Sequence, residues 1–348
     1  MKFVIKLFLR VNLFMKKFIN HADDFLEQSL SGLQSAHPEL LQVHKDPFFV
    51  TRKNINPHKV QIISGGGSGH EPLHTGFIGH GMLDIACPGH IFTSPTPDQM
   101  IAAIDYCQPK NGVLMIVKNY SGDVMNFEMA SEMIDTKNAT ILTNDDAAVI
   151  NSSYTEGKRG VAGTLIVEKV VGSLAESGAS LEECQQFGLH ANNLCSSIGV
   201  ALTSCTIPAA GKPTFDIEND QIEFGVGIHG EPGRRREAIR EANLIVSDMV
   251  EAIFQDFRER DVKIGGNSEF LVVVNGFGAT PLSELYLIFN SVTNILNEKQ
   301  LNIGRSLVGN FTTALDMAGA SVTLCLLDDA IQKHWDSSVY TPSLRWGI

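Results

Sequence analysis

A glycine-rich segment follows a short apolar run near residue 60, and it constrains the fold more than any other stretch. Val60 to Ile63 has the length and composition of a buried strand, and residues 64–72 then read Ser-Gly-Gly-Gly-Ser-Gly-His-Glu-Pro. Glycine permits a tight turn, positive φ and a close approach of ligand to backbone. Pro72 is suited to the first turn of a helix. His70 therefore lies where open α/β sheets carry their chemistry, although a plain tight connection with a surface histidine is the alternative.

Strand and helix patterns alternate along the first half of the chain. Asp23 to Leu33 has the apolar spacing of an amphipathic helix, and residues 96–99, Thr-Pro-Asp-Gln, form a capping box that begins another. Gly112 to Val117 is continuously apolar, as expected for a strand covered on both faces. Ala139 to Thr143 is a further predicted strand. This order predicts an α/β unit with a mostly parallel sheet.

The second half repeats this character after a change near residues 190–200. Before that change, a helix is predicted from Val161 to Glu176 and a second helix begins with a capping box at residues 180–183. After it, strands are predicted at Gly199 to Thr203 and Phe270 to Val274. We therefore predict two α/β domains with mostly parallel or mixed sheets, residues 15–195 and 196–348. The first fourteen residues are interpreted as an N-terminal extension, because residues 15–20 look like a natural start.

Composition limits the kinds of partner. The net charge is -12, so the surface as a whole repels nucleic acid and anionic membranes. The basic run at residues 234–236 is interpreted as an exposed helix start. Six cysteines without C-x-x-C spacing indicate reduced thiols in a cytoplasmic protein. No apolar run reaches the length of a membrane span.

Three strand-end turns carry titratable side chains: His70, Lys118 with Asp123, and His229. Each has a structural alternative, because a lone histidine is often structural, Asp123 could cap a helix and Lys118 could be surface charge. The pair at residues 145–146 is acidic, but no third oxygen ligand stands at a recognisable spacing, so a solvated loop is favoured over a metal site. No metal ligand set is predicted.

Five motifs in order carry a family resemblance. They are Ser-Gly-Gly-Gly-Ser-Gly-His-Glu-Pro at 64–72, Phe-Thr-Ser-Pro-Thr-Pro-Asp at 92–98, Lys-Asn-Tyr-Ser-Gly-Asp at 118–123, Gly-Ile-His-Gly-Glu-Pro-Gly at 227–233 and Asn-Gly-Phe-Gly-Ala-Thr-Pro-Leu-Ser-Glu at 275–284. Together they resemble the dihydroxyacetone-binding subunits of bacterial dihydroxyacetone kinases that depend on the phosphotransferase system. The resemblance runs from about Met15 to Gly347.

The resemblance implies a phosphotransferase subunit that forms a homodimer and holds its triose covalently. The triose would be bound as a hemiaminal on His229, while His70 and Asp123 would be the acid/base pair around it. The implied substrate-binding residues are Gly67, Ser68, Gly69, His70, Lys118, Asp123 and His229.

The phosphate donor is expected on another subunit. The chain has no G-x-x-x-x-G-K-[S/T] loop, and the segment 65–69 lacks the lysine of such a loop. Single-chain members of the family carry a nucleotide-binding domain after the region matched here, so this chain resembles the two-part form. No cofactor is expected on this chain. ADP or ATP with Mg²⁺ would be held by the partner subunit, which a phosphotransferase-system protein recharges from phosphoenolpyruvate.

A second function remains open at this level. The family often shows three aspartates where this chain has residues 144–146, Asn-Asp-Asp, and an arginine where it has Lys158. Both departures are interpreted as features of a partner-facing surface. Some paralogues keep the triose site but act as dihydroxyacetone-sensing coactivators of a transcription factor, without phosphoryl transfer. The kinase subunit is the favoured interpretation, and the motifs themselves are shared by both.

Overall fold

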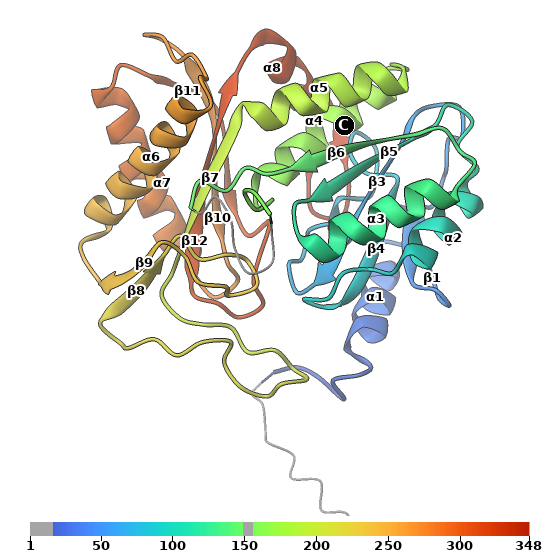
Figure 1. The fold of residues 1–348 in the computed structure, drawn as a ribbon, viewed down its shortest axis with the longest axis horizontal. Helices are drawn as coiled ribbons and strands as arrows, with labels where there is room; N and C mark the ends of the chain where they lie inside the picture. The colour runs from blue at the N-terminus through green and yellow to red at the C-terminus, as the bar shows by residue number, and fades with distance from the viewer. Residues whose placement is uncertain (1–16, 149–155, 348) are drawn as a thin grey trace, which may run out of the picture.

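The computed structural model describes residues 17–148 and 156–347, in which two six-stranded sheets stand side by side (Figure 1). The predicted pair of mixed α/β units is confirmed. Helices α4 and α5 contact strands of both sheets and so pack between them. The helices are α1 (Phe25–Ala36), α2 (Pro97–Cys107), α3 (Ser121–Met133), α4 (Gly163–Glu176), α5 (Leu181–Asn193), α6 (Ala242–Glu259), α7 (Leu282–Glu298) and α8 (Asp329–Asp336).

The first sheet has the order β1-β2-β4-β3-β5-β6, and its last four strands are parallel. Successive side chains of β5 alternate between two hydrophobic clusters, since Leu114 packs on the side of α4 and Met115 on the side of α2 and α3. Burial on both faces explains the continuous apolar run. The strands are β1 (Leu41–His44), β2 (Phe49–Arg52), β3 (Gln61–Ser68), β4 (Ile85–Ile91), β5 (Val113–Lys118) and β6 (Asn138–Thr143).

The second sheet has the order β11-β10-β12-β7-β8-β9, and only β10 and β11 are parallel. Helices α6 and α7 cover its outer face, where Val272 and Val274 are buried. Leu271 and Val273 join the cluster shared with the first half. The strands are β7 (Cys195–Ala201), β8 (Gln221–Phe224), β9 (Arg235–Ala238), β10 (Glu269–Gly276), β11 (Asn302–Gly309) and β12 (Gly319–Leu327).

The end of the chain returns to the first half. Strands β13 (Val339–Tyr340) and β14 (Arg345–Trp346) form a small hairpin, and Tyr340 pairs with His80. Strand β7 begins beside the predicted division between residues 195 and 196, and that division stays a prediction. The predicted extension, residues 1–14, lies outside the described residues. Across the described residues, no helix is both long and apolar enough to cross a membrane.

Most predicted elements are present, including the capping boxes that begin α2 and α5. The glycine segment differs, because β3 continues through it to Ser68 and the turn begins only at Gly69, where φ is +105°. A Cβ on Gly65 would lie 2.6 Å from the carbonyl oxygen of Cys87, and one on Gly67 would lie 2.6 Å from the amide nitrogen of Thr93. Close packing of neighbouring backbone therefore requires glycine inside the strand.

Three local predictions were wrong. Pro72 does not begin a helix; a single 3₁₀ turn, Thr75–Phe77, follows instead. The basic run does not begin a helix either, because Arg235 opens the edge strand β9, where its guanidinium pairs with Glu237 and Asp248. The acidic pair at residues 145–146 is buried and not solvated. Tertiary contacts decided all three against the local pattern.

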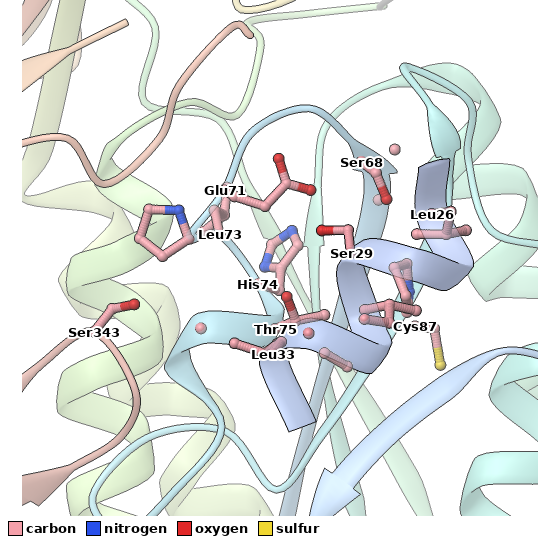
Figure 2. Close-up of a pocket in the computed structure, with 18 of the residues that line it drawn as sticks. Leu26, Ser29, Leu33, Ser68, Glu71, Leu73, His74, Thr75, Cys87 and Ser343 are labelled. Atoms are coloured by element: carbon pink, nitrogen blue, oxygen red, sulfur yellow. The ribbon is translucent and has the colours of Figure 1, made fainter. Parts of the chain in front are cut away.

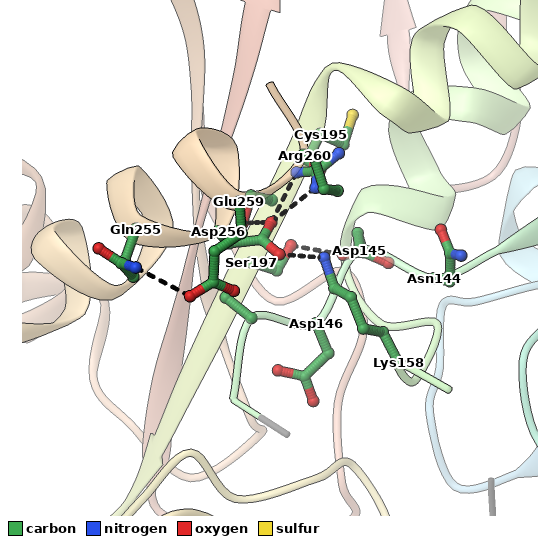
Figure 3. A network of polar contacts seen from close by, with 12 residues as sticks. Asn144, Asp145, Asp146, Lys158, Cys195, Ser197, Gln255, Asp256, Glu259 and Arg260 are labelled. Atoms are coloured by element: carbon green, nitrogen blue, oxygen red, sulfur yellow. Dashed lines mark hydrogen bonds and ion pairs between the residues drawn. The ribbon is translucent and has the colours of Figure 1, made fainter. Parts of the chain in front are cut away.

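The buried acidic pair belongs to a polar network between the two sheets (Figure 3). Asp145 accepts hydrogen bonds from two backbone N–H groups and from the Ser197 hydroxyl. Asp256 on α6 accepts from Lys158 at 2.5 Å and from Arg260 at 2.6 Å. The charge of Lys158 is therefore paired within the protein, and the Lys158 side chain is only 18% exposed.

Asp256→Asn should lower the free energy of unfolding by about 3 kcal/mol at pH 7, because it leaves two largely enclosed cations, with side chains 18% and 22% exposed, without their carboxylate. Burial alone raises the pKa of Asp256, but the charge and hydrogen bond of Lys158 outweigh it and lower that pKa. A carboxyl with a lowered folded-state pKa stabilises above its unfolded pKa and loses that contribution as the pH falls. Denaturant unfolding should therefore show the difference from wild type shrinking below about pH 4.

The matched control is Glu251→Gln on the same helix, where an exposed carboxylate pairs with Arg258 at 2.7 Å. Exposed pairs contribute less than about 1 kcal/mol. Equal losses for the two variants would contradict the interpretation of the network.

Candidate functional site

Two histidines from different halves of the chain meet at the site. His70 follows β3 and His229 follows β8, and their Nε2 atoms are 3.2 Å apart. Nδ1 of His70 is 2.8 Å from the carbonyl oxygen of Thr313. A carbonyl only accepts, so Nδ1 of His70 carries a hydrogen, and its Nε2 faces His229. One proton placed between the two Nε2 atoms completes this contact.

Aromatic rings enclose the histidine pair. The ring of Phe92 stacks on His70 with centroids 4.9 Å apart, and the ring of Tyr120 meets His229 edge-on at 4.6 Å. His70 is buried, whereas the His229 side chain keeps 19% exposure and lines a cavity. Burial first, and then the charges of His229 and Lys118, hold the pKa of His70 well below its ordinary value. His70 is thus suited to give up a proton, and His229 is the imidazole that a ligand can reach.

The carboxylate of Glu231 contacts both the backbone and the ring of His229. Glu231 accepts the backbone N–H of His229 at 2.8 Å, and its Oε1 lies 3.8 Å from Nδ1 of that ring. The buried guanidinium of Arg159 lies 3.5 Å from the same oxygen. Burial alone raises the pKa of Glu231, but the hydrogen bond and charge of His229 and the charge of Arg159 lower it to about 2. Glu231 is therefore ionised and favours positive charge on the His229 ring.

Glu231 was not predicted from the sequence as a functional residue. A signal was available, because the segment 227–233 places this glutamate two residues after the histidine, among glycines. A Cβ on Gly227 would lie 2.0 Å from the carboxylate, so the glycine makes room for it.

The cavity beside His229 has a volume of about 980 Å³ and lies between the two halves. Gly67 and Asp123 line it together with His229. Asp123 stands in the first turn of α3, and among the described residues its Oδ1 has no hydrogen-bond partner. A buried carboxylate oxygen without a donor is available to a ligand hydroxyl.

Lys118 lies beneath the glycine strand and does not itself line the cavity. Its Nζ donates to the carbonyl oxygen of Gly65 at 3.2 Å and lies 3.7 Å from Oδ2 of Asp123. A Cβ on Gly66 would lie 2.3 Å from Nζ, so this glycine admits the lysine. Lys118 therefore contacts the site through Asp123 and the strand backbone.

The remaining predicted residues are placed differently. The Ser68 hydroxyl donates to the carbonyl oxygen of Gly89 at 2.7 Å, and Ser68 lines a second cavity of about 550 Å³ under α1 (Figure 2). The backbone N–H of Gly69 donates to the carboxylate of Glu71 at 3.0 and 3.1 Å. Any role of Ser68 in the first cavity would thus use its backbone. No group of three or more metal-ligating side chains gathers within residues 17–148 and 156–347.

Comparison with known proteins identifies the family. Residues 31–343 match the Dak1 domain family. The chain is 45% identical to the PEP-dependent dihydroxyacetone kinase, dihydroxyacetone-binding subunit DhaK, of Escherichia coli, over 96% of this chain and 100% of that protein.

Solved structures share the fold over nearly the whole chain. The native form of the dihydroxyacetone kinase of C. freundii superposes with a TM-score of 0.84 at 31% identity, over 95% of this chain and 60% of that one. The dihydroxyacetone kinase operon co-activator DhaQ superposes with a TM-score of 0.82 at 33% identity, over 90% of this chain and 96% of that one.

The pKa of His70 offers a test of the site geometry without any ligand. We expect ¹⁵N NMR to show a neutral His70 ring at pH 6, with hydrogen on Nδ1, because burial and the neighbouring charges lower the pKa. His229→Asn should raise the pKa of His70, because it removes the second cause, but burial should keep it below the ordinary value near 6.5. A His70 that titrates like free histidine in both proteins would contradict the described packing.

Proposed function

The chain belongs to the Dak1 domain family, and on that premise we propose that it is the dihydroxyacetone-binding subunit of a phosphoenolpyruvate-dependent dihydroxyacetone kinase. The similarity to the E. coli subunit covers both chains nearly completely. The single structural observation that carries the proposal is the accessible His229 ring, with His70 at 3.2 Å on one side and an ionised Glu231 on the other. That arrangement suits covalent capture of a small ketone.

Covalent capture selects ketones by reactivity. An imidazole nitrogen that carries no hydrogen can add to a carbonyl carbon and form a hemiaminal. Glycerol has no carbonyl, so no adduct can form with it. This discrimination is stronger than a pocket can achieve by shape alone for such small polyols.

The proton shared by the histidine pair balances the addition. The pair is taken to start as a cation, with hydrogen on Nδ1 of His229 facing Glu231 and the shared proton on Nε2 of His229. The shared proton moves to Nε2 of His70, which frees Nε2 of His229 to bond to the ketone carbon. The C=O π bond breaks, and His70 gives that proton to the oxygen, which becomes a hydroxyl. His70 is left neutral, as its lowered pKa favours. The positive charge stays on the substituted His229 ring, where the Glu231 carboxylate stabilises it.

Asp123 is the proposed base for phosphoryl transfer. Its free Oδ1 can accept the hydrogen of the terminal triose hydroxyl as phosphate arrives. Backbone N–H groups near Gly67 can bind triose oxygens, because no side chain intervenes. The nucleotide, ADP or ATP with Mg²⁺, is proposed to reside on a partner subunit that a phosphotransferase-system protein recharges, which leaves positioning and charge as the contributions of this chain.

We also propose that the protein is a cytoplasmic homodimer. Exposed apolar side chains lie on the second half, just after β9 and on α6 and α7, beside an apolar groove between these elements. Such a patch favours a protein contact, and a second copy of this chain is the proposed occupant. The residues are Ile239, Leu244, Leu282, Tyr286 and Leu287.

A triose-sensing coactivator is the second candidate. The co-activator DhaQ shares this fold closely, and capture on a histidine would serve sensing as well as transfer. The higher identity and complete coverage of the E. coli kinase subunit favour the kinase.

Kinase activity should require the partner and Asp123. With ATP alone the purified chain should form no dihydroxyacetone phosphate. Product should appear when the cognate nucleotide-binding subunit and its phosphoenolpyruvate-driven donor are added.

Asp123→Ala should lower kcat about 100-fold or more while triose binding persists, because the carboxylate removes a proton and does not form the adduct. A coupled assay for dihydroxyacetone phosphate measures product in both experiments.

Glu128→Ala, on the exposed side of the same helix, is the control and should retain activity. Near-full activity of Asp123→Ala would reduce Asp123 to a helix cap. A wild-type chain that stays silent with its cognate partner would instead favour the coactivator.

A further inference from the structure

A line of buried ionisable groups extends from Asp123 away from the cavity. Nζ of Lys118 is 2.8 Å from Nε2 of His74, and Nδ1 of His74 is 2.6 Å from Oε1 of Glu168 on α4. Lys118 and Glu168 are fully enclosed, and His74 is 5% exposed at the wall of the cavity under α1 (Figure 2). The triose chemistry described above does not use His74 or Glu168.

Two arrangements of hydrogens fit this line of heavy atoms. In the first, ionised Glu168 accepts from Nδ1–H of His74, and Nε2 accepts from a Lys118 ammonium. In the second, a neutral Glu168 carboxyl donates to Nδ1, and Nε2–H donates to a neutral Lys118 amine. His74 is neutral in both, and the two differ only in which ring nitrogen carries the hydrogen.

From this geometry we propose that His74 relays a proton from Glu168 to Lys118, which places a positive charge beside Asp123 when an anionic phosphoryl group approaches. The Glu168 O–H bond breaks as Nδ1–H forms, and the Nε2–H bond breaks as a new Lys118 N–H forms. Glu168 becomes a carboxylate, Lys118 becomes an ammonium, and no proton comes from solvent. The trigger rests on the proposed kinase function, whereas the relay itself does not.

The surroundings bring the two arrangements close in energy. Burial raises the pKa of Glu168 to about 8 against the opposing charge of Lys118. Burial lowers the pKa of Lys118, opposed by the charges of Asp123 and Glu168. Burial and the charges of Lys118 and His70 hold the pKa of His74 well below its ordinary value, so imidazolium is avoided.

The surroundings of Glu168 and Lys118 differ in how well they stabilise a charged side chain. Among the described residues, Oε2 of Glu168 is buried without a hydrogen-bond partner, which disfavours the carboxylate in the resting protein. Lys118 has Asp123 within 3.7 Å, so added negative charge at that end favours the ammonium. The Ser64 hydroxyl donates to the Ile116 carbonyl and lies 3.0 Å from Nδ1 of His74, which fixes the ring in place. An approaching phosphate therefore shifts protons towards Lys118.

The direct test is the hydrogen position on His74, read by ¹⁵N NMR of the histidine-labelled full chain without partner or substrate. Wild type should show a mixture of the two neutral forms. Asp123→Asn removes the anion next to Lys118 and should raise the ratio of the Nε2–H form to the Nδ1–H form by about tenfold, although residue 123 does not touch His74. The control is Glu176→Gln, which removes a carboxylate from the same helix α4 and should leave the ratio unchanged. A single His74 form that is the same in wild type and Asp123→Asn would overturn the relay.

A kinetic test follows in the reconstituted kinase. Glu168→Gln can neither give nor take the proton, so kcat should fall about tenfold or more while KM for dihydroxyacetone changes less than about twofold. Combined with Lys118→Met it should cost nothing further, because Glu168 acts through Lys118. Additive losses would assign Glu168 a structural role and contradict the relay. If the wild-type protein has no kinase activity, the proposed function fails, and the NMR comparison alone tests the relay. The NMR comparison is likewise the test of the relay in the case that the Glu168→Gln variant does not fold.

Discussion

The contact between His70 and His229 is the constraint on which the site depends, because it joins residues that lie 159 positions apart in the chain. Neither sheet could place it alone. The segment before β12 holds the turn after β3, since the Thr313 hydroxyl donates to the carbonyl oxygen of Glu71 at 2.9 Å and the backbone N–H of Leu315 donates to that of Gly69 at the same distance. These bonds fix His70 against the second half. The cavity and its chemistry exist only where the two halves meet.

The glycine segment provides the space in which this contact forms. Gly66 leaves room for Lys118, and Gly67 lets the loop after β4 approach closely enough to place Phe92 on His70. On the other side, Gly227 leaves room for the Glu231 carboxylate. Because Gly66 and Gly227 have no side chains, the charged groups of Lys118 and Glu231 can pack directly against the backbone of the site. Buried charges at such a site are stabilised by partners fixed in advance, as electrostatic catalysis requires.

Local sequence patterns predicted much of the fold because burial and capping are local signals. The continuous apolar run of β5 and the capping boxes of α2 and α5 were predicted correctly. The turn at Pro72 and the strand at Arg235 were not, because contacts with distant residues overrode their local preference. Helix and strand patterns reflect interactions between residues close in sequence, whereas the conformations of these two segments are determined by contacts with residues distant in sequence.

The candidate site was predictable only in part. His70, Asp123 and His229 follow strands and carried a signal. The structure places Asp123 and His229 on the wall of one cavity and His70 in contact with His229. Glu231, His74 and Glu168 act through buried contacts between distant segments, and Glu168 in particular lies inside an apolar helix pattern that gives no hint of a partner. Long-range pairing of that kind has no local sequence signal.

The proposed function depends on covalent binding of the triose by His229, assisted by His70 and Glu231. ¹³C NMR of dihydroxyacetone labelled at its carbonyl carbon tests this most directly, with the purified chain in excess. The signal of the bound triose should move from the ketone region to that of a tetrahedral carbon, and the moved signal should be absent with His229→Asn. A bound triose that keeps its ketone signal in the wild-type protein would rule out covalent capture by His229.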